Sequence, residues 1–240
     1  MKLLEASEGL TRADRKSYRP HAFTVPPGTA ALRIEFRYDR GGEDPHSLMT
    51  VQLFDPRGFR GAAHRFAPRQ VIEIGAMRAT PGFVPGAIPA GEWTIEVDVH
   101  SVIAPPDGQP NVYTVQVEAA AEVDDAITVA SPDRAPDPPP SNGRRWLRGE
   151  LHLHSEHSDG RWTTGEMAAL ARHRRLDFMF LTDHNTTTGV DVLRSQVGDA
   201  ISVLPGIELT TYAGHALALG ADKWVDWRTG RQGRTANDMA

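Results

Sequence analysis

Cysteine is absent from this chain of 240 residues, and its absence excludes several kinds of chemistry. Without cysteine there is no disulfide bond, no thiolate nucleophile and no zinc site built on sulfur. Any metal ion would have to be held by imidazole nitrogens and carboxylate oxygens. That ligand set leaves zinc, manganese and iron open.

The chain also lacks a basic excess and any long apolar run. Lys and Arg together number 26, against 31 Asp and Glu, and no basic block occurs. This balance argues against nucleic acid as a partner, because phosphate backbones are bound by clustered positive charge. No run approaches the ~18 apolar residues of a membrane span, and residues 1–6 form no signal segment. We therefore expect a soluble, cytoplasmic protein with no membrane partner, and the oligomeric state stays open.

The first 121 residues carry the alternating apolar and polar pattern of β-strands. It is clearest in residues 31–38, 49–54, 93–99 and 112–117, which clusters of proline and glycine separate. Each sheet needs a second sheet over its apolar face, so the pattern predicts an all-β sandwich over residues 1–121. Residues 89–95 resemble the closing strands of bacterial jelly-roll accessory modules, which implies a jelly-roll-like sandwich. Residues 122–145 are polar and rich in proline, which indicates a semi-rigid linker.

From residue 146 the pattern changes to alternating strands and helices. It predicts strands at 147–154, 177–183, 201–209 and 215–219. Thr163 followed by Glu166 is the signature of a capping box, so a helix should begin there. A strand, helix and strand in succession predict a parallel sheet, with functional groups at the carboxyl ends of its strands.

Potential metal ligands gather after these predicted strands, and six of the ten histidines lie between positions 152 and 215. Two imidazoles spaced two residues apart on a strand point the same way and can share one metal ion. Glu208 could bridge two cations, and Asp183 is as plausible as a group that orients a metal-bound histidine as it is a metal ligand. The predicted ligands are His152, His154, Asp159, His184, Glu208 and His215.

These motifs together resemble the PHP (polymerase and histidinol phosphatase) superfamily, and within it the CehA/McbA-type metallohydrolases. The matching segments are 151–160, 182–186, 205–210 and 214–215, within a resemblance covering about 70 residues. It implies a distorted (β/α)7 barrel that holds two or three divalent metal ions at the strand ends. By this resemblance His152 and His154 bind one metal ion, Glu208 bridges to a second that His215 contacts, and Asp159 with His184 helps to bind a third.

The chain departs from this family pattern at its end. The later motifs, a further histidine and an Asp-x-His, are missing, because the sequence stops at Ala240 with about four of the seven strands. We therefore expect two domains: the sandwich, and in residues 146–240 the first part of a PHP-type barrel, truncated after the third metal-binding motif. On this expectation the chain by itself lacks full activity.

The ligand types indicate a hydrolase. Divalent cations lower the pKa of bound water to about 7 and so supply hydroxide at neutral pH. We expect hydrolysis of a phosphoester, or of a related ester or carbamate bond, in a small-molecule substrate, with Asp183 and Glu208 as catalytic residues. Two alternatives stay open: a non-catalytic metal-binding or glycan-binding scaffold, and an enzyme that processes nucleic acid, against which the acidic balance argues.

Overall fold

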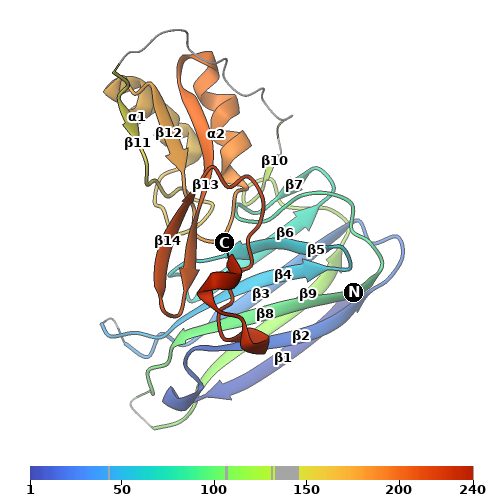
Figure 1. The fold of residues 1–240 in the computed structure, drawn as a ribbon. Helices are drawn as coiled ribbons and strands as arrows, with labels where there is room; N and C mark the ends of the chain where they lie inside the picture. The colour runs from blue at the N-terminus through green and yellow to red at the C-terminus, as the bar shows by residue number, and fades with distance from the viewer. Residues whose placement is uncertain (43, 106–107, 131, 133–145, 240) are drawn as a thin grey trace. The chain divides into compact units, whose positions relative to one another are not determined.

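The computed structural model describes residues 1–42, 44–105, 108–130, 132 and 146–239, which form two compact units (Figure 1). These units are Met1–Ala130 and Ser131–Ala240. The predicted linker, 122–145, falls largely on residues 131 and 133–145, which lie outside the described residues.

The first unit contains two antiparallel sheets. One has six strands in the order β1-β9-β3-β6-β7-β10 and the other four in the order β2-β8-β4-β5. The first sheet consists of β1 (Lys2–Leu10), β9 (Asn111–Ala120), β3 (Ala31–Tyr38), β6 (Arg69–Gly75), β7 (Arg78–Ala79) and β10 (Val129–Ala130). The second consists of β2 (Ser17–Val25), β8 (Gly91–Ser101), β4 (Leu48–Asp55) and β5 (Gly58–Ala63), and a 3-10 turn, η1 (Arg12–Asp14), precedes β2.

Alternate residues of both sheets meet in one apolar core. In β3 the side chains of Leu32, Ile34 and Phe36 are fully buried, and in β8 those of Trp93 and Ile95 lie in the same cluster. Removing these side chains from water is the main favourable term for this unit. The four strands predicted from alternation, β3, β4, β8 and β9, are confirmed, whereas the other strands of this unit were not singled out.

The second unit is built on a four-stranded sheet in the order β11-β12-β13-β14. Its elements are β11 (Gly149–Glu150), α1 (Thr164–Arg174), β12 (Phe178–Leu181), α2 (Gly189–Val197), η2 (Gly198–Ala200), β13 (Ser202–Thr211), β14 (Gly214–Leu219), η3 (Arg231–Gly233) and η4 (Ala236–Met239). β11, β12 and β13 are parallel. Both α-helices pack on the sheet face that carries Met179 and Leu181.

Helix α1 begins where the sequence predicts. The Thr163 hydroxyl accepts a hydrogen bond from the Glu166 backbone N–H at 3.2 Å, and the Glu166 carboxylate accepts one from the Thr163 N–H at 2.8 Å. The helix ends at Arg175, whose left-handed backbone, with φ of 55°, closes the last turn. Among the described residues, no helix has both the length and the apolar character needed to cross a membrane.

The predicted first part of a (β/α)7 barrel is wrong. β13 turns directly into β14 through Tyr212 and Ala213, and the two strands are antiparallel. A parallel neighbour would need a crossover of a dozen or more residues, and a two-residue turn leaves no room for one. The described part of the chain has three sheets and only two α-helices, far fewer than a barrel with a helix after each strand requires.

The predicted strand at 147–154 is also largely wrong. Only Gly149 and Glu150 pair with β12, so His152 and His154 follow the strand in an irregular segment. Leu151 is 47% exposed, and Leu153 packs against the core.

The capping box gives a test of the second unit. Thr163→Ala removes the side-chain acceptor of the Glu166 N–H and should lower the free energy of unfolding of this unit by about 1 kcal/mol. Thr163→Ser keeps the acceptor and should unfold like the wild type. The measurement is urea denaturation followed by the helical circular dichroism signal, because both described α-helices lie in this unit. Equal loss in both variants would contradict the capping argument.

Candidate metal centre

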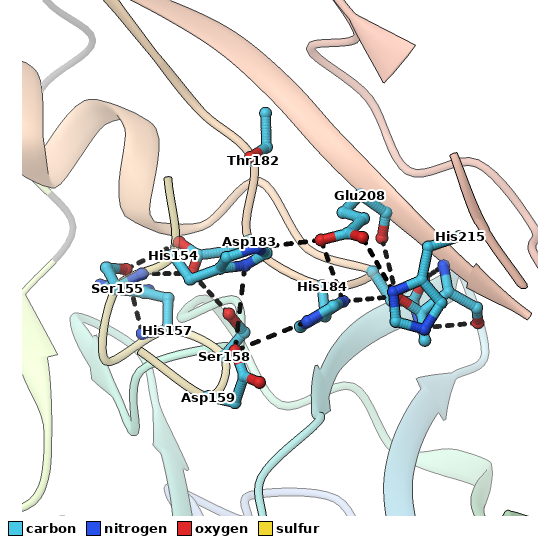
Figure 2. Close-up of polar contacts among 12 residues, drawn as sticks. His154, Ser155, His157, Ser158, Asp159, Thr182, Asp183, His184, Glu208 and His215 are labelled. Carbon is cyan, nitrogen blue, oxygen red and sulfur yellow. Dashed lines mark hydrogen bonds and ion pairs between the residues drawn. The ribbon is translucent and has the colours of Figure 1, made fainter. Parts of the chain in front are cut away.

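The sheet of the second unit brings all six predicted ligands to one end. Figure 2 labels five of them: His154, Asp159, His184, Glu208 and His215. His152 and His154 follow β11, and Asp159 lies on the loop that continues from them. His184 follows β12 and forms an isolated parallel bridge with Glu208, which lies within β13. His215 is the second residue of β14 and pairs with Thr210 of β13.

These residues form three overlapping groups. The groups are His152, His154 and Glu208; His154, Asp159 and His184; and His184, Glu208 and His215, each with ligand atoms within 4.8 Å of one another. His154, His184 and Glu208 each belong to two groups. Four imidazoles and two carboxylates at such distances suit divalent zinc, manganese or iron, so the donor set fits the metals expected from the sequence.

Glu208 lies at the centre of the cluster. Its Oε2 atom is 2.9 Å from the Nε2 atoms of both His152 and His154, and its Oε1 atom is 2.8 Å from His215 Nδ1. The two carboxylate oxygens thus face different histidines, which is the arrangement that a bridging ligand needs. Burial alone would raise the pKa of Glu208, but the neighbouring imidazoles, with His152 first, lower it below its ordinary value. Glu208 is therefore a carboxylate at neutral pH.

The rings of His154 and His184 stack, with centroids 4.4 Å apart and planes inclined by 19°. Burial lowers the pKa of His154, and the proximity of His184 lowers it further. A neutral imidazole keeps the lone pair that a metal ion requires. Asp159 faces both rings, with its Oδ1 atom 3.9 Å from His154 Nδ1 and 3.5 Å from His184 Nε2.

Asp183 lies beneath the loop that carries these ligands and belongs to none of the three groups. Its carboxylate accepts hydrogen bonds from the Ser155 N–H and hydroxyl, both at 2.7 Å, and from the Ser158 hydroxyl at 2.6 Å (Figure 2). Burial raises the pKa of Asp183, and these donors oppose the shift. The geometry favours a positioning role for Asp183, which fixes the loop between His154 and Asp159, over the predicted catalytic role.

Several supporting residues were not predicted. Ser155 and Ser158 hold Asp183, and Asn185 pairs its side-chain amide with both backbone polar groups of Thr210. Asn185 has a left-handed backbone with φ of 60°, which asparagine tolerates better than most residues. His157, whose role the sequence leaves undefined, is buried and hydrogen-bonded to Thr188. Such contacts join distant segments, so only the position of Asn185 directly after His184 offered a signal.

A cavity of about 580 Å³ opens beside His154. Its wall is mainly apolar, with Leu153, Leu170 and the half-exposed Trp162. Arg148 and Arg174 also line it. This size and lining suit the non-reacting part of a small molecule.

Comparison with known proteins gives a limited result. No family model matches the chain. A stretch of 65 residues, 26% of the chain, is 32% identical to the 5′-3′ exoribonuclease Rnm of Salmonella typhimurium strain LT2. The chain spans only 22% of the length of that protein. The match therefore points to a hydrolase without establishing a family.

Gly160 gives a test of the loop that carries the ligands. A Cβ atom there would lie 2.3 Å from the His154 carbonyl oxygen and 2.4 Å from its carbon. Gly160→Ala must therefore displace the backbone of His154, and we expect zinc affinity to fall about tenfold or more in a calorimetric titration.

Gly165 provides the matched control, because its nearest neighbour would be 3.8 Å from an added Cβ. Gly165→Ala favours helix α1 by up to about 1 kcal/mol and should leave zinc affinity unchanged. Equal zinc affinity in the two alanine variants would contradict the claim that zinc binding depends on the position of the His154 backbone.

Proposed function

We propose that this chain is a divalent-metal-dependent hydrolase that acts on phosphoester bonds. The observation that carries the proposal is the contact of one buried carboxylate, Glu208, with His152, His154 and His215. The partial similarity to an exoribonuclease supports it, because that enzyme class hydrolyses phosphodiester bonds. The proposal also draws on the resemblance of the motifs in residues 148–220 to the PHP superfamily.

Each ligand group has a role in this proposal. His152, His154 and Glu208 would hold one cation, and the groups around Asp159 and His215 would hold others. A bound cation would lower the pKa of water and polarise the ester under attack. Burial lowers the pKa of His154 and so favours the neutral imidazole that a cation requires. The catalytic role proposed for Glu208 is to place negative charge between the imidazoles that hold the cations.

The cavity beside His154 would receive the rest of the substrate. Trp162 offers a ring face for an aromatic or apolar group, and Arg148 and Arg174 offer positive charge that the carboxylate of Glu150 offsets in part. A small phosphoester with an aromatic leaving group fits this lining. A related ester or a carbamate is the alternative substrate for the same metal-dependent hydrolysis.

A second candidate is hydrolysis of the phosphodiester bonds of RNA. The similarity to the exoribonuclease favours it, whereas the net charge of −5 opposes it, because nucleic-acid sites are usually basic. A labelled oligoribonucleotide in the substrate screen separates the two candidates.

Glu208 gives the direct test. Glu208→Gln keeps the shape of the side chain and removes the charge shared by three imidazoles, so turnover of an aryl phosphodiester should fall about 100-fold or more. Asp222→Asn is the matched control, since Asp222 is exposed in the same unit and outside the ligand groups. It should keep wild-type turnover.

The same assay includes removal of metal. Chelation should abolish turnover, and zinc, manganese or iron should restore it in the wild type. If the metal-saturated protein hydrolyses no phosphoester, ester, carbamate or RNA, the proposed function is wrong. Metal binding or glycan binding without turnover would then favour the scaffold alternative.

The cavity gives a separate prediction. Trp162→Ala removes the aromatic wall, so KM for an aryl phosphoester should rise roughly three- to tenfold while kcat changes little. Trp146→Ala is the control, because Trp146 is 100% exposed and does not line the cavity. An unchanged KM in Trp162→Ala would remove this cavity from the substrate site.

A further inference from the structure

The hydroxyl of Thr210 lies between the ring of His184 and the backbone carbonyl of Glu208. The residue lies on β13 and is 2% exposed. Its Oγ1 atom is 2.5 Å from His184 Nδ1 and 3.3 Å from the Glu208 carbonyl oxygen. A hydroxyl has one hydrogen to donate, so these two contacts require a definite division of roles.

The carbonyl oxygen of Glu208 can only accept a hydrogen bond, so the Thr210 hydroxyl must donate to make that contact. Its oxygen is then an acceptor for His184, and Nδ1 of His184 must carry the hydrogen. A neutral imidazole with hydrogen on Nδ1 has its lone pair on Nε2. That nitrogen faces Asp159, at 3.5 Å from Oδ1.

This arrangement matters because His184 belongs to two ligand groups. Its Nδ1 atom lies 3.6 Å from Glu208 Oε2, whereas its Nε2 atom lies next to Asp159. Only a nitrogen without hydrogen can bind a metal ion, so the position of one hydrogen decides which group His184 serves.

We propose that Thr210 is a positioning residue that holds His184 with hydrogen on Nδ1 and thereby assigns Nε2 to the cation held with His154 and Asp159. Glu208 and His215 then serve a cation without His184. The inference rests on the proposed metal centre and adds a residue that orients one of its ligands.

The backbone of Thr210 is fixed in place. Its N–H donates to Asn185 Oδ1 at 2.8 Å, and its carbonyl oxygen accepts from Asn185 Nδ2 at 3.3 Å. Asn185 directly follows His184, so one amide side chain ties the histidine's own segment to the strand that carries Thr210. The hydroxyl therefore stays aligned with the ring.

The opposite arrangement makes a different prediction. If the Thr210 hydroxyl donated to Nδ1, the hydrogen of His184 would lie on Nε2 and point at Asp159, and the contact with the Glu208 carbonyl would be lost. The two arrangements differ in which ring nitrogen is protonated, a property that nuclear magnetic resonance measures directly.

The test is a long-range ¹H–¹⁵N correlation spectrum of the histidine rings in the metal-free protein, at a pH above the ordinary histidine pKa. We expect His184 with hydrogen on Nδ1 in the wild type and in Thr210→Ser, which keeps the hydroxyl. Thr210→Val has nearly the same shape without the acceptor, so the hydrogen should shift toward Nε2. Wild-type His184 with hydrogen on Nε2 would overturn the proposal, even if the valine variant did not fold.

Zinc titration supplies the second readout. Thr210→Val should weaken one zinc site about tenfold, and combination with Asp159→Asn should add little further loss. The loss of zinc affinity caused by Thr210→Val should instead add to the loss caused by His215→Ala. Thr211→Val is the matched control, since its hydroxyl bonds Gly214 O in an exposed turn of the same hairpin.

Full additivity with Asp159→Asn would contradict the assignment of His184 to that group. Failure of the wild type to bind zinc would overturn the proposed function, and the spectrum of the metal-free protein would still decide the tautomer. The two failures are thus distinguishable.

Discussion

The parallel pairing of β12 with β13 sets the distances on which the candidate metal centre depends. Its register places Leu181 opposite Pro205 and continues as the bridge between His184 and Glu208. The Asn185 N–H donates to the Glu208 carbonyl at 3.1 Å and extends the pairing past the strand end. A slip of one residue would turn Glu208 to the other face of the sheet and separate it from the imidazoles.

Hydrogen bonds between buried polar side chains fix the segments that carry the ligands. Asp183 and the hydroxyls of Ser155 and Ser158 fix the loop after β11, and Thr210 with Asn185 fixes the segment after β12. A buried polar group costs free energy unless it is hydrogen-bonded, so these contacts restrict the loops to few arrangements. The ligands are thereby held close together before any cation binds, which lowers the ordering cost of binding.

Local patterns predicted the elements that depend on neighbouring residues. Alternation located β3 and β8, and the capping box located the start of α1. The predicted barrel was wrong because a motif resemblance does not set the length of the connections between strands. The four residues between Thr210 and His215 can form a hairpin turn but not a crossover helix. The strand predicted through His152 and His154 was wrong because apolar alternation continued beyond the last residue with a pairing partner.

The sequence by itself determined the chemistry available to the site. Without cysteine, and with six of the ten histidines between positions 152 and 215, a cation could be held only by nitrogen and oxygen. The tertiary structure decided which residues share a group, which oxygen of Glu208 faces which histidine, and which nitrogen of His184 faces Asp159. His152 and Glu208 are 56 residues apart, so the distance between them is fixed by strand register and loop packing and not by any local pattern.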